Sequence, residues 1–111
     1  MELISLSRLG DEHLAKAGES RQGRSSHTVV GGRDRSLRHL LLALKAGEEL
    51  ADHEAPGEAT VLVLSGRVTL GTSTDEATVA AMELLEIPDE RHHLRALEDS
   101  VVVLTVAKSL S

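Results

Sequence analysis

Two corners of the sequence carry side chains that could do chemistry, and both contain histidine. The first is Asp52-His53-Glu54, which precedes a turn at Pro56-Gly57. The second is Arg91-His92-His93, which follows a turn at Pro88-Asp89. Imidazole changes its charge near neutral pH, so it serves as a general acid or base, and it is also a frequent metal ligand. If the fold brings the corners together, they form a polar site at the ends of strands.

A metal held tightly by imidazole and carboxylate groups needs at least three protein ligands. Glu58 is a candidate third ligand, although strand alternation turns its side chain the wrong way unless a β-bulge re-aims it. A set of His53, His92 and Glu58 would leave coordination positions open. It would suit one divalent transition metal, either iron, manganese, nickel or zinc.

His39 is a further candidate ligand, because the alternation of the run 36–44 places it on the same face as Leu37 and Leu41. A different interpretation of His53 and His92 is structural. They would then be partly buried side chains that are hydrogen-bonded to backbone or to glutamates at the mouth of a barrel. The residue types alone do not choose between these two roles.

The composition limits the partners of the chain. Its 111 residues make one domain, and it contains no Phe, Tyr or Trp, so its core is aliphatic and no aromatic face can stack on a ligand. The net charge of −6 argues against binding to nucleic acid or to an anionic membrane. The arginines between residues 21 and 38 are interpreted as a solvated loop. The chain has no cysteine and no apolar run of membrane-spanning length, so we expect a soluble, cytoplasmic protein.

Short β-prone runs, most of them separated by turn residues, predict an all-β antiparallel barrel over residues 25–111. The clearest run is Ala59–Leu64, which we expect to pair with residues 66–70 as a hairpin through Ser65-Gly66. The other expected strands are 27–30, 36–45, 78–80, 82–87, 92–96 and 101–106. The run 36–45 is rich in leucine and ambiguous, but its length and its position between glycine turns favour a strand buried on both faces.

An N-terminal arm is expected over residues 1–24. Leucines recur near helical spacing at positions 6, 9 and 14, which predicts a short amphipathic helix over 5–17 that ends at Gly18. The segment Glu19–Ser26 is expected to be an exposed connector. The arm should cover apolar surface either on the barrel or on a partner subunit.

Gly47, His53 and Gly66, together with the proline turn before His92, resemble the two sequence motifs of the cupin superfamily. The layout is similar to small single-domain bacterial cupins over about residues 27–108. The resemblance implies a cupin-type β-barrel (a double-stranded β-helix, or jelly roll) with a metal site in its mouth. The sequence also departs from the first motif. Alanine stands at the position of the second motif histidine (Ala55) and at the position of the motif glutamate (Ala59).

The choice between the two histidines of the second corner rests on alternation. If Leu94 and Ala96 face the core, then His92 faces inward and His93 outward. Counting from Pro88 by the family spacing gives His93 instead. We favour His92, because strand alternation is a local physical constraint and loop length is not.

Three functions follow from these observations. The first is a binding protein that holds a small polar ligand, with or without a weakly bound metal, near His53 and His92, with Glu58 and His39 as further ligand-binding candidates. The second, which the cupin resemblance implies, is a metal-dependent enzyme of the dioxygenase or isomerase type. Ala55 and Ala59, which replace two of the motif's metal ligands, count against this function. The third is a non-catalytic homodimeric accessory protein. A homodimer is expected in each case, because strands that are apolar on both sides need a cover on the second face.

Overall fold

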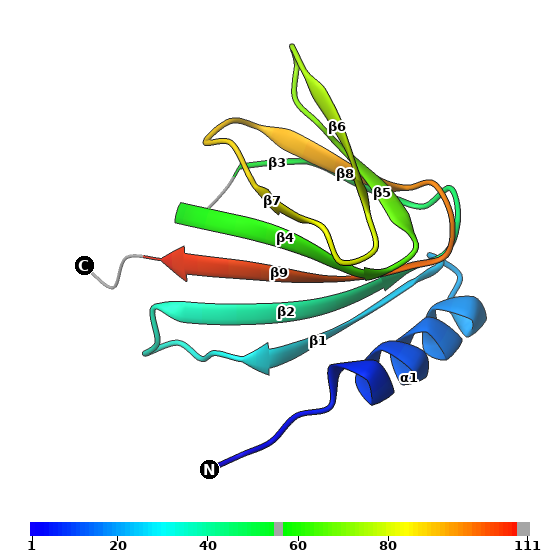
Figure 1. The fold of residues 1–111 in the computed structure, drawn as a ribbon, viewed down its shortest axis with the longest axis vertical. Helices are drawn as coiled ribbons and strands as arrows, with labels where there is room; N and C mark the ends of the chain where they lie inside the picture. Colours follow the sequence, from blue (N-terminus) through cyan, green and yellow to red (C-terminus); the bar gives the residue numbers. More distant parts are fainter. Residues whose placement is uncertain (55–56, 109–111) are drawn as a thin grey trace.

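The fold is described by a computed structural model, in which residues 1–54 and 57–108 are placed, apart from the side chain of His53. Within these residues the chain forms one helix followed by nine strands (Figure 1). In chain order the elements are α1 (Leu6–Glu19), β1 (Arg24–Val30), β2 (Leu37–Leu44), β3 (Glu49–His53), β4 (Gly57–Ser65), β5 (Arg67–Gly71), β6 (Glu76–Ala80), β7 (Leu84–Glu86), β8 (His92–Ala96) and β9 (Ser100–Lys108).

The strands form two antiparallel sheets. The larger sheet has the order β1-β2-β9-β4-β7, and the smaller has the order β3-β8-β5-β6. One aliphatic cluster takes side chains from the inner faces of both sheets, which makes the molecule a two-layered barrel. The predicted all-β antiparallel barrel with an N-terminal helical arm is therefore confirmed.

The inner cluster follows from strand alternation. In β4, Ala59, Val61 and Val63 are buried while their neighbours are not, and in β8 the buried positions are His92, Leu94 and Ala96. Full burial of a Val or Leu side chain contributes roughly 1.5–3 kcal/mol, so these positions supply much of the folding free energy. The cluster between the sheets consists of aliphatic side chains.

The outer face of the larger sheet carries a second cluster beneath α1. It contains Leu41, Ala43, Val101 and Ala17, with the helix leucines packed against it. Gly10 lets the helix approach closely, because a Cβ there would lie 3.2 Å from Val101 Cγ1. The arm thus covers one part of the sheet whose two faces are both apolar. Among the described residues, no helix is long and apolar enough to span a membrane.

The helix ends later than expected. Ser5 caps its N-terminus by accepting a hydrogen bond from the Arg8 N–H at 3.2 Å, and the last helical residue is Glu19. Gly18, which was expected to end the helix, lies inside it. The expected connector 19–26 is also shorter, since β1 already begins at Arg24. Pairing with β2 extends this strand through residues whose own composition is loop-like.

The predicted hairpin between 59–64 and 66–70 is wrong. β4 lies in the larger sheet and β5 in the smaller one, where β5 pairs with β6 and β8. Gly66 has φ +87°, and a Cβ there would lie 2.4 Å from the Asp99 carbonyl oxygen. At this glycine the chain therefore crosses from one sheet to the other instead of reversing within one.

The expected strand 82–87 is reduced to the three residues of β7. Met82 lies in a turn with φ 66°, so extended structure starts only at Leu84. The remaining expected strands are present, including 36–45, which forms β2 and is extended along its whole length.

Candidate ligand site at the barrel mouth

His92 lies on the inner face of the barrel. It is 3 % exposed, and it shares its face with Leu94 and Ala96, whereas the His93 side chain is 31 % exposed on the opposite face. The alternation argument that favoured His92 as the inward residue is confirmed. Its Nδ1 lies 2.9 Å from the Glu90 carbonyl oxygen, which can only accept, so Nδ1 carries the hydrogen of this bond.

The two histidine corners meet in the smaller sheet. His53, the last residue of β3, is opposite His92, the first residue of β8, in the strand register. The register shifts between Leu50 and His53, so a bulge precedes this pair. The side chain of His53 lies outside the described part of the structure. The convergence of the two imidazole rings therefore stays a prediction.

The neighbours of both histidines are tied together on the outer side of the sheet. Asp52 Oδ1 lies 3.3 Å from His93 Nδ1, and Asp52 Oδ2 lies 4.0 Å from Arg91 Nε. Arg91 Nη2 also donates to the Asp52 carbonyl oxygen at 3.4 Å. Exposed pairs of this kind are individually weak, but they join the end of β3 to the start of β8. They help to hold the two corners in register.

Glu58 does not lie on the face of His92. Its β4 neighbour Ala59 is 7 % exposed in the inner cluster, so alternation turns Glu58 outward, where it is exposed. The pairing of β4 with β9 is regular from Gly57 to Val63. The bulge that would have re-aimed Glu58 is absent from this part of the strand.

His39 also faces outward. It shares its face with Leu37 and Leu41, as expected, but this is the outer face of the sheet, the face on which α1 packs farther along the strands. Its Nδ1 lies 2.8 Å from Thr105 Oγ1, its cross-strand neighbour in β9. Of the four predicted ligand-binding residues, only His53 and His92 belong to the same corner.

A tightly bound metal does not fit these donors. Among the side chains that the structure describes, no group of three or more His, Cys, Asp or Glu residues could hold an ion. With Glu58 and His39 on the outer face and Ala59 in the inner cluster, the predicted set retains its two histidines alone. Two imidazoles fall short of the three protein ligands that such a site needs.

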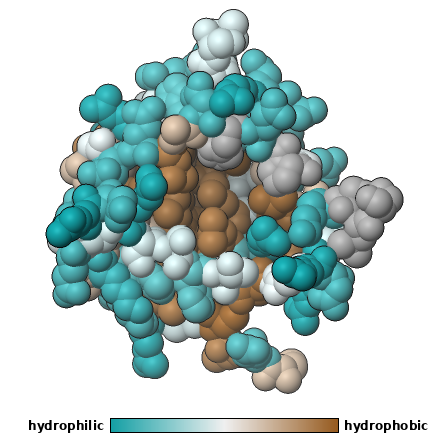
Figure 2. Space-filling view, turned by 180° about the vertical axis from the view of Figure 1, so that it is seen from behind, coloured by the Kyte–Doolittle hydropathy of each residue, from teal (hydrophilic) through white to brown (hydrophobic). Residues whose placement is uncertain are grey.

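The inner face of the larger sheet is open to solvent on one side. Figure 2 shows a hollow whose floor is hydrophobic and whose rim is hydrophilic. Cross-strand rows of aliphatic side chains cover the inner face of this sheet, and Leu104 and Val106 among them remain partly exposed. This hollow can thus receive the apolar part of a small molecule.

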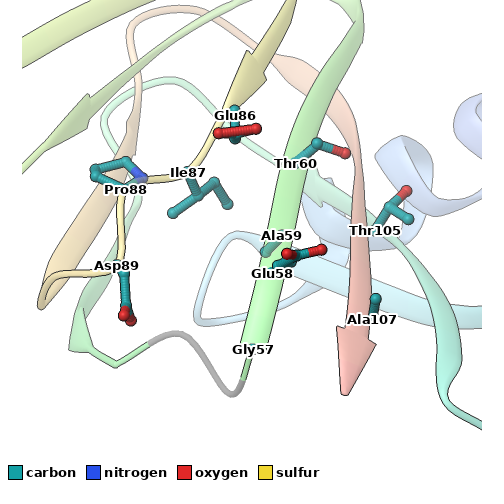
Figure 3. Close-up of a pocket in the computed structure, with 10 residues that line it drawn as sticks. All are labelled: Gly57, Glu58, Ala59, Thr60, Glu86, Ile87, Pro88, Asp89, Thr105 and Ala107. Atoms are coloured by element: carbon teal, nitrogen blue, oxygen red, sulfur yellow. The ribbon is translucent and has the colours of Figure 1, made fainter. Parts of the chain in front are cut away.

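A second hollow of about 630 Å³ lies at the end of β4 (Figure 3). It forms because β4 and β7 separate there: Ile87 N–H still donates to the Ala59 carbonyl oxygen at 2.9 Å, but Pro88 has no N–H to continue the ladder. Its polar side chains include the carboxylates of Glu58, Glu86 and Asp89. These belong to the outer face and to the loop, so this hollow is separate from the His92 corner.

One residue of the inner face was missed by the sequence argument. Arg38 continues the face of Leu40 and Leu42 in β2 and is opposite Val106 in β9. The arginine-containing stretch 21–38, which ends at this residue, predicts a solvated loop instead. The alternation of the run 38–44 was a signal that could have placed it on the barrel interior.

Comparison with known proteins identifies the fold. No protein-family model matches the sequence, and no curated protein is significantly similar to it. Among solved structures, a cupin superfamily protein from Desulfitobacterium hafniense matches with a TM-score of 0.70 and 16 % identity, over 78 % of each chain. The chain has a cupin fold.

Two further solved structures that match the chain are of proteins of unknown function. A conserved protein of unknown function from Streptococcus pyogenes matches with a TM-score of 0.72 and 27 % identity, over 81 % of this chain and 78 % of its own. A protein of unknown function from Rhizobium leguminosarum matches over 98 % of each chain, with a TM-score of 0.71 and 13 % identity. The likeness therefore establishes the cupin fold and leaves the ligand to be argued from the site.

Proposed function

We propose that this cupin is a binding protein that holds a small molecule in the barrel mouth, with its polar end at the His53 and His92 corner. The observation that supports it best is the placement of His92, a polar side chain that is 3 % exposed on an otherwise aliphatic inner face. The same molecule has a hollow with a hydrophobic floor and a hydrophilic rim, through which we expect a ligand to enter (Figure 2). Small-molecule sites are typically concave and apolar with a few placed polar groups.

The alternative of a metal-dependent dioxygenase or isomerase has less support. Such an enzyme needs a third protein ligand, and both sequence candidates, Glu58 and His39, face away from the interior. Ala59, which stands at the position of the motif glutamate, packs in the inner cluster. Binding without metal chemistry is the function that uses the residues present.

The proposal is tested by methyl NMR of the full chain with a panel of small alcohols, amides and carboxylic acids. A ligand in the mouth should shift the methyl signals of inner-face residues such as Val61 and Leu104 and leave outer-face Leu62 and Leu84 unchanged. His92→Leu should weaken binding of the responding compounds about tenfold, equivalent to about 1.4 kcal/mol, because it removes the polar group inside the mouth.

His39→Leu is the matched control, since it removes a histidine from the outer face of the same barrel. It should leave the affinity unchanged. If no compound perturbs the inner-face methyl groups, or if the His92 and His39 variants weaken binding equally, the proposed site is wrong.

We also propose that the protein is a homodimer. The arm covers only part of the outer face, because Leu41 lies beneath it but the cross-strand row that starts there continues through Val103 and Leu62 to Leu84. Leu41 and Val103 are buried, whereas Leu84, at the far end of this row, is 65 % exposed. A second copy would remove the exposed end of this apolar strip from water.

A further inference from the structure

We infer that the ligand is an aliphatic carboxylate whose chain lies on the inner face of the larger sheet and whose carboxylate is bound by Arg38. The inference rests on the proposed binding of a small molecule in the barrel mouth and gives it a ligand class, and for this class the polar end lies at Arg38 instead of at the His53 and His92 corner.

The floor of the barrel is built from cross-strand rows of aliphatic side chains. One row consists of Leu40, Leu104, Val61 and Leu85, and the next consists of Leu42, Val102 and Val63. All of these residues belong to the inner cluster or, like Leu40, continue its face. Leu40, Leu104 and Leu85 are partly exposed, whereas Val61 and the second row are buried in the cluster. The partly exposed leucines offer an alkyl chain van der Waals contact and no hydrogen-bonding group.

Arg38 stands at one end of this floor. It occupies the same face as Leu40 and Leu42, and it begins a third row that continues through Val106 to Ala59. Arg38 to Leu40 is two residues along an extended strand, about 7 Å, and Leu40 to its neighbour Leu104 is one strand spacing, about 5 Å. This path of partly exposed residues suits the chain of a short- to medium-chain fatty acid.

Arg38 is partly buried, and its stem lies against Gly31, where a Cβ would be 3.3 Å from Arg38 Cγ. None of the ion pairs formed within the described part of the chain involves Arg38. Arginine stays charged at all physiological pH values, and its planar fork matches a carboxylate in a bidentate pair. An anionic head group would supply the counter-charge that this arginine lacks.

A second cation lies at the same end of the sheet. Lys108 alternates with Val106 and Leu104 in β9, which places it on the inner face, opposite Gly57 of β4. Both cations contrast with the net charge of −6 of the whole chain. A carboxylate without an alkyl chain is therefore expected to bind poorly, because the molecule as a whole repels anions.

Other ligand classes fit this floor less well. Sugars and nucleobases are commonly held by stacking on aromatic rings, and the chain has no Phe, Tyr or Trp. A neutral alkyl compound would use the floor and leave Arg38 without a counter-charge. An aliphatic carboxylate uses both features at once.

The test compares octanoate, 1-octanol and acetate by calorimetric titration and methyl NMR of the full chain. Octanoate should bind, raise the melting temperature by mass action and shift the methyl signals of Leu40, Val61 and Leu104. 1-Octanol should bind more weakly at the same methyl groups, and acetate should not bind. Arg38→Gln should reduce octanoate affinity about tenfold or more, because a charged pair is lost, and should leave 1-octanol affinity unchanged.

Two further variants keep the result interpretable. Arg38→Lys retains the charge and should retain part of the octanoate affinity, and Arg35→Gln, in the exposed loop before β2, should change nothing. Equal losses for octanoate and 1-octanol in Arg38→Gln, or octanoate shifts confined to the outer face, would overturn the inference. If alcohols or amides shift the inner methyl groups and octanoate does not, the ligand class is wrong but the binding site stands; if nothing shifts them, both fail.

Discussion

At the scale of single residues, His92 and His93 show how alternation divides adjacent side chains of one type. His92 is buried on the inner face, where it bonds the Glu90 carbonyl oxygen, and His93 lies outside against Asp52. The same rule places Arg38 inside and His39 outside. The chemistry of the mouth thus depends on strand parity more than on residue type.

Gly71 is required by the ring of His93, its cross-strand neighbour. A Cβ at position 71 would lie 2.6 Å from His93 Cε1, so the ring would have to leave its place beside Asp52. We predict that Gly71→Ala destabilises the fold by about 1–3 kcal/mol, as is usual for overpacking. Chemical denaturation measures the change.

The double variant Gly71→Ala, His93→Ala is the control for this prediction. With the His93 ring removed, Gly71→Ala should lower the free energy of unfolding much less than it does in the wild-type background. An unchanged cost in both backgrounds would show that the backbone at position 71, and not the ring, requires glycine.

At the scale of elements, the attachment of α1 to the sheet contains a titratable group, His13. His13 is 6 % exposed between α1 and β1, and its Nδ1 lies 2.6 Å from Ser25 Oγ. Its ring centroid is 5.4 Å from that of His27. Burial, followed by the charges of Lys16 and His27, lowers the pKa of His13, and Glu12 opposes this shift.

We predict that acidification weakens the fold through His13. Since its pKa in the folded protein lies below the unfolded value of 6.5, the unfolded chain takes up the proton first. Stability should be highest above about pH 6.5, fall as the pH drops below it, and level off below the folded pKa. Denaturation between pH 7.5 and pH 5 measures this slope.

His13→Gln should reduce the slope, because it removes the titrating group. His27→Ala should preserve most of it, because burial is the largest cause of the shift. A slope abolished by the His27 variant would show that repulsion between the two histidines, and not burial, sets the pKa.

At the scale of the whole molecule, the barrel has two apolar faces on its larger sheet and one arm to cover the outer of them. If the remaining strip forms a homodimer interface, light scattering should give twice the mass of 11.9 kDa. Leu84→Asp should shift the mass to that of a monomer, because it places a charge in the strip. Leu97→Asp, at another exposed leucine outside this row, is the control and should leave the mass unchanged. A monomeric wild-type chain would show that the arm suffices.

Sequence alone was enough to locate most of the strands, the helical arm and the inward direction of His92. These features depend on periods of about two and 3.6 residues, which are properties of short segments. The hairpin at Ser65-Gly66 failed for the opposite reason. A glycine turn between two β-prone runs shows that the chain bends, but the bend at Gly66 joins different sheets.

The sequence by itself determined an aliphatic barrel and the sets of residues that share a face, because alternation is local. Only the tertiary structure decided which of those faces lines the barrel interior. His39 does share the face of Leu37 and Leu41, yet that face belongs to the side of the sheet on which α1 packs, and the neighbouring face with Arg38 became the floor of the mouth. The packing of the sheets decides which face lies inside, and this packing brings together segments that are far apart in the chain. The residue spacing within one segment therefore does not predict it.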